Sequence, residues 1–182
     1  MFLVNVNSCA LADKYIVPKS KIMKLESEKF GAIGNWEKLD ERFDETIVKQ
    51  VNDASCVSAV GEMLANYYGF GISQKEILEN IGNWSNSVAL AKFLNSKETE
   101  SNVEWIGGGC AQIFEHIAIL LREVQVWVAL LRDGNTRGHA VLVCGQEKNL
   151  VKIKDPFDQT IYKTDIFELD RVLSELVFRR RK

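Results

Sequence analysis

The chain has 182 residues, of which 46% are hydrophobic and 26% are charged, a composition typical of globular proteins that excludes disorder as the main state. This length suits one domain with a substantial core. The formal net charge of -2 provides no overall basic field of the kind that nucleic-acid-binding proteins use, so we expect no nucleic-acid partner.

Residues 1–45 show little periodicity, and we expect an N-terminal arm that packs on a catalytic domain formed by residues 46–182. The N-terminus lacks the basic start and apolar run of a signal peptide, and no stretch approaches 18 consecutive apolar residues. We therefore expect no membrane span and a cytoplasmic location in the producing cell. Any delivery or secretion would then use a route without a conventional signal peptide.

Residues 50–69 place a cysteine where an amphipathic helix begins. The larger apolar residues that follow recur at the spacing of one buried helical face: Val57, Val60, Leu64 and Tyr67. Asp53 or Ser55 can cap this helix, and Gly69 can close it. A thiol at Cys56 would face unpaired backbone N–H groups and the positive end of the helix dipole, which favour the nucleophilic thiolate. The alternative interpretation is a small core residue.

A short helix is expected after a capping box at residues 73–76, and Asn86-Ser87 can cap another. The glycine run 107–109 breaks the pattern, and a stronger helix is expected over residues 113–121. From residue 125 the apolar runs become short and alternate with turn residues, which predicts an antiparallel meander. Its strands are expected at residues 126–131, 139–144, 150–154 and 160–163. A helix over 165–174, a last strand at 176–178 and a solvated basic tail at 179–182 complete an α+β arrangement.

The four cysteines are widely spaced, and no pair has the Cys-x-x-Cys spacing of zinc or redox motifs, so we expect them to be reduced. They are Cys9, Cys56, Cys110 and Cys144. With only two histidines in the chain, His116 and His139, we expect no metal and no other cofactor. His116 is expected to be a packed or surface residue of its helix.

His139 opens the second predicted strand of the meander, and Asp155 follows the third. Because antiparallel pairing brings the start of one strand opposite the end of its neighbour, the two side chains are predicted side by side at one edge of the sheet. An imidazole beside Cys56 can stabilise a thiolate and protonate a leaving amine, while a carboxylate fixes its tautomer. Asp158 is the alternative carboxylate. Gln50, six residues before the cysteine, can donate an N–H to an oxyanion.

The order Gln50, Cys56, His139, Asp155 resembles the papain-like cysteine peptidase superfamily. Four strings look most like the papain-fold toxin domains of bacterial polymorphic toxins and, more distantly, the peptidase domains that process double-glycine bacteriocin leaders. They are Asp53-Ala-Ser-Cys-Val-Ser-Ala-Val-Gly-Glu-Met-Leu, Trp105-Ile-Gly-Gly, Gly138-His-Ala-Val-Leu-Val and Lys154-Asp-Pro-Phe. The resemblance covers residues 48–178. It implies a papain-like fold with the nucleophile at a helix start in an N-terminal helical half, and with His and Asp on a C-terminal antiparallel sheet.

By this resemblance Cys56 is the nucleophile, His139 the base, Asp155 its partner and Gln50 the oxyanion donor. Gly107 and Gly108 match a glycine pair that lines the substrate cleft in such folds. Trp105, in the same string, is predicted as a further substrate-binding residue, with a place in the core as the alternative.

The prediction that follows is a thiol-dependent acyl-transfer hydrolase, a cysteine peptidase acting on peptide bonds of a protein or peptide substrate. The toxin resemblance implies a bacterial toxin or effector with an immunity or inhibitor protein as a partner. A glutamine deamidase uses the same chemical steps, and a non-catalytic binding module would keep the scaffold without turnover. Bacteriocin-processing peptidases tend to have Asp-Cys-Gly at the nucleophile, whereas this chain has Ser55-Cys56-Val57, which argues against leader cleavage.

Overall fold

The computed structural model describes residues 30–32, 36–109, 124–132 and 138–182. In this part of the chain the main feature is a seven-stranded antiparallel sheet with the order β3-β8-β7-β6-β5-β9-β4. Its strands are β3 (Leu39–Phe43), β4 (Val103–Gly109), β5 (Trp127–Leu131), β6 (His139–Glu147), β7 (Leu150–Asp155), β8 (Thr160–Asp165) and β9 (Leu173–Arg181). Two short strands, β1 (Phe30–Gly31) and β2 (Trp36–Glu37), form a separate antiparallel pair. The predicted meander is confirmed as β5 to β8.

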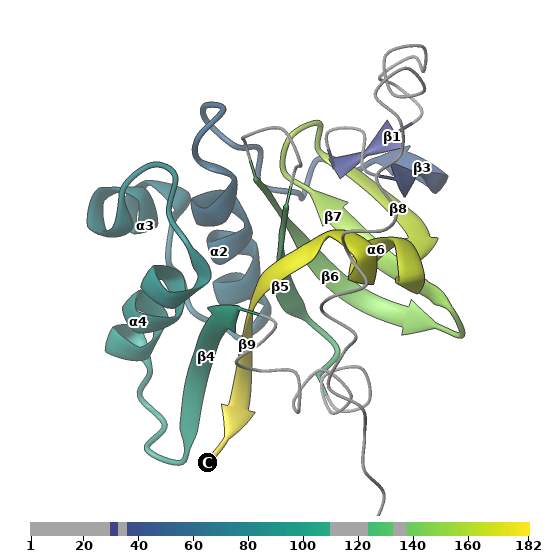
Figure 1. The fold of residues 1–182 in the computed structure, drawn as a ribbon. Coiled ribbons are helices and arrows are strands. Elements are labelled where there is room, and N and C mark those ends of the chain that lie inside the picture. The colour runs from purple at the N-terminus through teal and green to yellow at the C-terminus, as the bar shows by residue number, and fades with distance from the viewer. Residues whose placement is uncertain (1–29, 33–35, 110–123, 133–137) are drawn as a thin grey trace, which may run out of the picture.

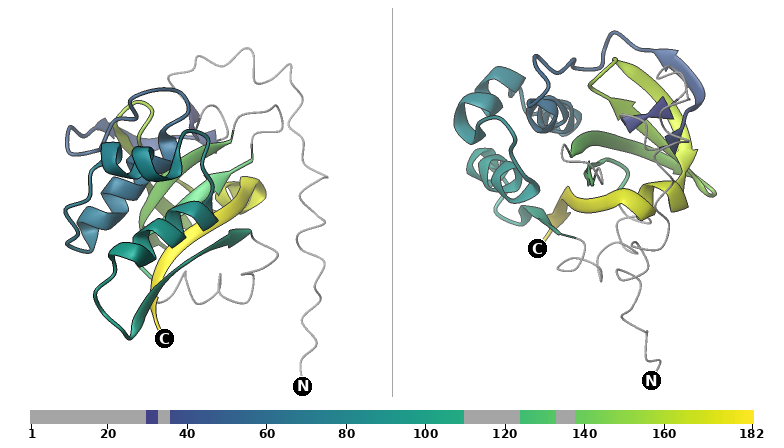
Figure 2. Two further views of the ribbon diagram at one scale, coloured as in Figure 1. Left: turned by 90° about the vertical axis from the view of Figure 1, so that its left-hand side faces the viewer. Right: turned by 45° about the horizontal axis from the view of Figure 1, so that its top comes forward.

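Among the described residues, three helices precede most of the sheet, and a fourth joins its last two strands in sequence. They are α2 (Cys56–Tyr67), α3 (Gln74–Ile81), α4 (Ser87–Lys97) and α6 (Ile166–Val172). Figure 1 shows α2, α3 and α4 grouped on one side of the sheet, and the two views of Figure 2 show the same grouping. The α+β class, with helices first and an antiparallel sheet second, is confirmed. None of the described helices has the length and apolarity needed to cross a membrane.

The helix boundaries follow from local sequence signals. The side chains of Ser73 and Asn86 accept the backbone N–H groups of the third residue after each, as the capping patterns predict. Gly69, with φ of +83°, follows α2 in the left-handed region that glycine adopts readily. The expected side-chain cap of α2 is wrong, because Ser55 occupies the N-cap position without making a cap hydrogen bond.

Alternation along the strands places two apolar cores on the two faces of the sheet. The first core joins one set of strand residues to α2, α3 and α4: Val128, Leu130, Ala140, Leu142 and Val177. The second core contains the intervening residues: Ala129, Leu131, Val141, Val143, Ile153 and Leu176. Leu169 and Val172 of α6 and Trp36 of β2 pack into the second core. By the same alternation, His139 and Asp155 lie on the face of the sheet that carries the second core.

Three features differ from the sequence-based expectations. Residues 103–109 form β4, although their glycines suggested only a break. The basic run is not a solvated tail: β9 extends to Arg181, and the Arg179 side chain is only 16% exposed. The N-terminal arm contributes β3 to the main sheet through pairing with β8. The helix expected at 113–121, with His116, and the remaining predictions for Cys9 and Cys110 lie outside the described residues.

Candidate active site

Cys56 is the first residue of α2 and is 6% exposed. The turn before it is held by its own side chains. The Asn52 N–H donates to the Ser55 hydroxyl at 3.0 Å, and that hydroxyl donates back to the Asn52 carbonyl at 2.9 Å. The first turn of α2 contains no acidic residue, so the positive end of the helix dipole is available to stabilise a negative charge on the sulfur.

His139 and Asp155 lie side by side, as the hairpin argument predicted. His139 is the first residue of β6 and Asp155 the last of β7, and His139 Nε2 lies 2.7 Å from Asp155 Oδ1. The two residues are only 3% and 2% exposed. Asp158, the alternative carboxylate, instead accepts hydrogen bonds from Lys38 and Thr160. Among the described carboxylates, Asp155 is therefore the partner that the structure gives to His139.

The imidazole also interacts with Cys56. Burial lowers the pKa of His139, but the charge and hydrogen bond of Asp155 raise it, and a hydrogen bond and charge interaction with Cys56 raise it further. The net effect raises the pKa from 6.5 to about 10. Since Nε2 faces Asp155, the other ring nitrogen, Nδ1, is the one left for the sulfur. The sulfur, the imidazole and the carboxylate thus form a connected series.

Asp155 accepts four hydrogen bonds. Besides His139 at Oδ1, the Phe157 N–H donates to Oδ1 at 3.0 Å, the Ala32 N–H donates to Oδ2 at 3.1 Å, and the Tyr162 hydroxyl donates to Oδ2 at 3.2 Å. Burial alone raises the pKa of this carboxyl group. The His139 charge and the hydrogen bonds outweigh burial and lower the pKa below 3.8, so the carboxylate stays ionised near neutral pH.

Gln50 lies in the segment before α2 and is tied to the turn after Asp155, because its backbone N–H donates to the Pro156 carbonyl at 2.9 Å. Its side-chain N–H donates to the Asn52 carbonyl at 3.0 Å. The side-chain oxygen of Gln50 is buried and has no hydrogen-bond partner among the described residues. These contacts place Gln50 between the nucleophile turn and the carboxylate turn, while its role as an oxyanion donor stays a prediction.

The three residues predicted to bind substrate have packing roles. A Cβ on Gly107 would lie 2.2 Å from the Ser87 carbonyl oxygen, so this glycine lets β4 approach the start of α4. Gly108 is buried and pairs with Leu176 of β9. Trp105 is 3% exposed, and its indole N–H donates to Glu98 at 2.9 Å. These positions do not support a contact between the three residues and a substrate.

Trp105 belongs to an ion-pair cluster that contains none of the predicted catalytic residues. The Arg179 guanidinium donates to both carboxylate oxygens of Glu98, at 2.9 and 3.1 Å, and lies 5.2 to 5.9 Å from the rings of Tyr68, Phe70 and Trp105. These hydrogen bonds lower the pKa of Glu98 from 4.5 to about 2.

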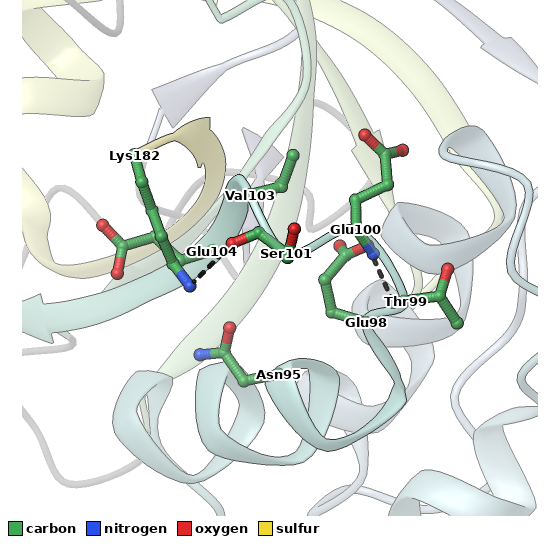
Figure 3. A pocket seen from close by; sticks show the side chains of 8 residues that line it. All are labelled: Asn95, Glu98, Thr99, Glu100, Ser101, Val103, Glu104 and Lys182. Carbon is green, nitrogen blue, oxygen red and sulfur yellow. Dashed lines mark hydrogen bonds between the residues drawn. The ribbon is translucent and has the colours of Figure 1, made fainter.

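A pocket of about 410 Å³ includes Glu98 and Glu100 of this cluster in its lining. Figure 3 shows the lining residues, which lie between residues 95 and 104 and at Lys182. The pocket contains none of the predicted catalytic residues. Its carboxylates are engaged elsewhere: Glu98 and Glu100 pair with Arg179, and Glu104 pairs with Arg180. The pocket therefore provides no second candidate for the active site.

Several residues that support the candidate site carried no recognised signal in the sequence: Ala32, Trp36, Lys38 and Tyr162. The first two lie more than 120 residues from the groups they bind. Ala32 contributes a backbone N–H, which no side-chain pattern reveals. The ring of Phe157 lies edge-on to His139, with 6.4 Å between the centroids. The sequence indicated this residue only through the Lys154-Asp-Pro-Phe string of the family resemblance.

Comparison with known proteins gives a consistent result. The family model described as Peptidase C39 family matches residues 44–178. Cysteine protease effector 1 of Escherichia coli O1:K1:H7 is 31% identical over 134 residues, which are 72% of this chain and 26% of that protein. The chain thus spans about a quarter of the length of this curated relative.

Two solved structures share the fold. The peptidase domain of Streptococcus ComA, a bi-functional ABC transporter involved in quorum sensing, has a TM-score of 0.57 at 17% identity, covering 74% of this chain and 97% of that one. A double glycine motif protease from an AMS/PCAT transporter, solved with a leader peptide, has a TM-score of 0.56 at 16% identity, covering 80% and 94%. The predicted relationship to papain-like and bacteriocin-processing peptidases is confirmed.

Proposed function

Because the chain belongs to the Peptidase C39 family, we propose that it is a cysteine peptidase in which Cys56 is the nucleophile, His139 the acid–base group and Asp155 the orienting carboxylate. The observation that carries this proposal is the convergence of the three side chains, with the 2.7 Å contact between His139 and Asp155 as its centre. A raised pKa of His139 supports the role, because a protonated imidazole beside the sulfur stabilises a thiolate.

In the proposed reaction, the Cys56 thiolate attacks the carbonyl carbon of a peptide bond. The carbonyl oxygen becomes an oxyanion, and Gln50 is the side chain proposed to donate an N–H to it. When the C–N bond breaks, His139 transfers its proton to the departing amine and a thioester remains on Cys56. Water then attacks the thioester while His139 takes its proton, and the acid product leaves with the thiolate restored.

The substrate we propose is a protein of a target cell, since the curated relative is called a cysteine protease effector. The stretch Ser55-Cys56-Val57 departs from the Asp-Cys-Gly of bacteriocin-processing peptidases, which favours a protein target over a double-glycine leader. An immunity or inhibitor protein that blocks the site would be the corresponding partner in the producing cell.

Modification of Cys56 by iodoacetamide tests the proposal without a known substrate. We expect Cys56 in the native protein to react at neutral pH at least about tenfold faster than in the urea-unfolded chain, because thiolate is the reacting form. Substitution His139→Ala should abolish that excess. Equal rates in native and unfolded protein, with no effect of His139→Ala, would exclude the catalytic role.

Expression in a bacterial host tests the effector activity. Wild type and Cys56→Ala, brought to equal protein levels, should differ in growth, with the wild type slower. Mass spectrometry of the two host proteomes then identifies the reaction. New peptide termini in the wild-type culture support the peptidase, whereas glutamine-to-glutamate conversions without new termini would indicate a deamidase in its place.

A further inference from the structure

A segment outside the family match makes direct contact with the candidate site. The family model begins at residue 44, whereas Ala32, Trp36 and Lys38 precede it. We call these three residues the N-terminal clamp. Ala32 binds Asp155 at the end of β7, Lys38 binds Asp158 in the turn that follows, and Trp36 binds the Tyr162 side chain of β8.

The first contact of the N-terminal clamp is direct. The Ala32 backbone N–H donates to Asp155 Oδ2 at 3.1 Å, and Ala32 is 1% exposed. Its φ of +50° lies in the left-handed region, which is unfavourable for any residue other than glycine. Such backbone conformations persist where the surrounding structure imposes them, and they gather at functional sites. Here the unfavourable conformation aims an amide at the carboxylate.

The second contact runs through a tyrosine. The Trp36 indole N–H donates to the Tyr162 hydroxyl at 3.1 Å, and that hydroxyl donates to Asp155 Oδ2 at 3.2 Å. Because the indole N–H can only donate, it obliges the hydroxyl to accept there and to direct its own hydrogen towards the carboxylate. Burial, followed by the Asp155 charge, raises the pKa of Tyr162 well above 10, so the hydroxyl keeps this hydrogen.

The third contact holds the turn. The Lys38 ammonium group binds Asp158 Oδ2 at 3.0 Å and also pairs with Glu41. It lies 5.7 Å from the centre of the Tyr162 ring, within the range of a cation–π contact, and its side chain is 3% exposed. One residue therefore binds both the turn after Asp155 and the ring that donates to it.

We propose that the N-terminal clamp positions the Asp155 carboxylate, so that Ala32 and the Trp36–Tyr162 pair are positioning residues for His139. The inference rests on the proposed function, because it assigns a role towards the same three catalytic groups. Oδ1 of the carboxylate holds the imidazole, and the clamp fixes Oδ2 on the other side. With both oxygens held, the plane of the carboxylate is set, and with it the orientation of the imidazole towards Cys56.

The test compares Trp36→Phe, Tyr162→Phe and the double variant in the full-length chain. Each substitution removes one hydrogen-bond donor and keeps an aromatic ring. The readout is the rate of Cys56 modification by iodoacetamide as a function of pH, with Cys56→Ala reporting the background from other cysteines. We expect Tyr162→Phe to lower the rate at neutral pH about five- to tenfold, the scale of one hydrogen bond. Trp36→Phe should have a smaller effect and should add nothing in the double variant, because it acts through Tyr162.

Trp127→Phe is the matched control, because Trp127 is buried in the same core as Trp36. It should lower the unfolding midpoint in urea and leave the pH profile of modification as in the wild type. An unchanged profile in Tyr162→Phe, or effects of Trp36→Phe that add fully to it, would overturn the positioning role. A wild type whose Cys56 reacts no faster than the unfolded thiol would instead overturn the proposed function, so the two failures are distinguishable.

Discussion

Substitution Asp155→Asn tests the central contact of the site, since it keeps the size of the side chain and removes its charge. The carboxylate accepts two hydrogen bonds at Oδ1 and two at Oδ2. An amide has one oxygen and one NH₂ group. At one of the two positions, the NH₂ donor must therefore face the donors that the carboxylate oxygen had accepted. If the NH₂ group takes the Oδ2 position, it meets the Ala32 N–H; at the Oδ1 position it meets the Phe157 N–H. Neither backbone group can turn away.

The expected cost follows from this geometry. A buried donor left unpaired costs roughly 1–3 kcal/mol. The buried His139 also loses the charge that favours its protonated form, which adds to the cost while the imidazole is protonated. We therefore expect Asp155→Asn to lower the free energy of unfolding by about 2 kcal/mol or more at pH 6. Urea unfolding at pH 6 measures this difference.

Asp158→Asn is the matched control for this substitution. Asp158 lies in the turn directly after Asp155, its side chain is 37% exposed, and its Oδ1 accepts from Thr160, which an amide oxygen can also do. Loss of its partly exposed pair with Lys38 should cost less than about 1 kcal/mol. Equal losses in the two variants, or a wild-type midpoint in Asp155→Asn, would refute the assignment of Asp155 as the fixed partner of His139.

Three further predictions concern pH, the distal ion pair and the close approach of β4. The pKa of His139 is raised from 6.5 to about 10, so its contribution to stability is complete below pH 6.5 and is lost as pH rises through 10. The difference in unfolding free energy between wild type and Asp155→Asn should therefore shrink between pH 6.5 and about 10, as measured by urea titrations at several pH values. Arg179→Met should lower the unfolding free energy by roughly 3 kcal/mol, because it leaves the 4% exposed Glu98 carboxylate without its main partner, and should leave Cys56 modification unchanged. Gly107→Ala should lower it by about 2 kcal/mol or more, since the new methyl group meets a main-chain oxygen at 2.2 Å, whereas Gly71→Ala, with open space around it, serves as the control.

The parts of the site that the sequence predicted share a local origin. Cys56 follows a turn and starts a helix with regular apolar spacing, so its position depends on residues within one element. The neighbourhood of His139 and Asp155 follows from a single hairpin, because antiparallel pairing relates the start of β6 to the end of β7. Periodicity and pairing rules are sufficient for both.

The missed parts depend on contacts between distant segments. The glycines of β4 interrupted the helical pattern and gave no strand signal, since glycine is unfavourable in strands, but Gly107 is required where the strand meets the Ser87 carbonyl of α4. The role of Trp36 carried no recognised signal in the sequence, since its partner Tyr162 lies 126 residues further along the chain. A tertiary contact between such distant segments leaves no periodic pattern in the sequence of either one.

The partners of Asp155 also explain how its carboxylate can be both buried and ionised. Within the β7–β8 turn, the carboxylate receives only the Phe157 N–H, and burial would favour its protonated form. A protonated carboxyl group would withdraw the charge that keeps His139 protonated beside Cys56. The His139 charge and hydrogen bond lower the pKa of this carboxyl group most, and the Ala32 N–H, which comes from outside the segment that the family model matches, lowers it further. The charge state of the candidate site therefore depends first on the contact between His139 and Asp155, and the Ala32 N–H adds to it from a segment that the family model does not match.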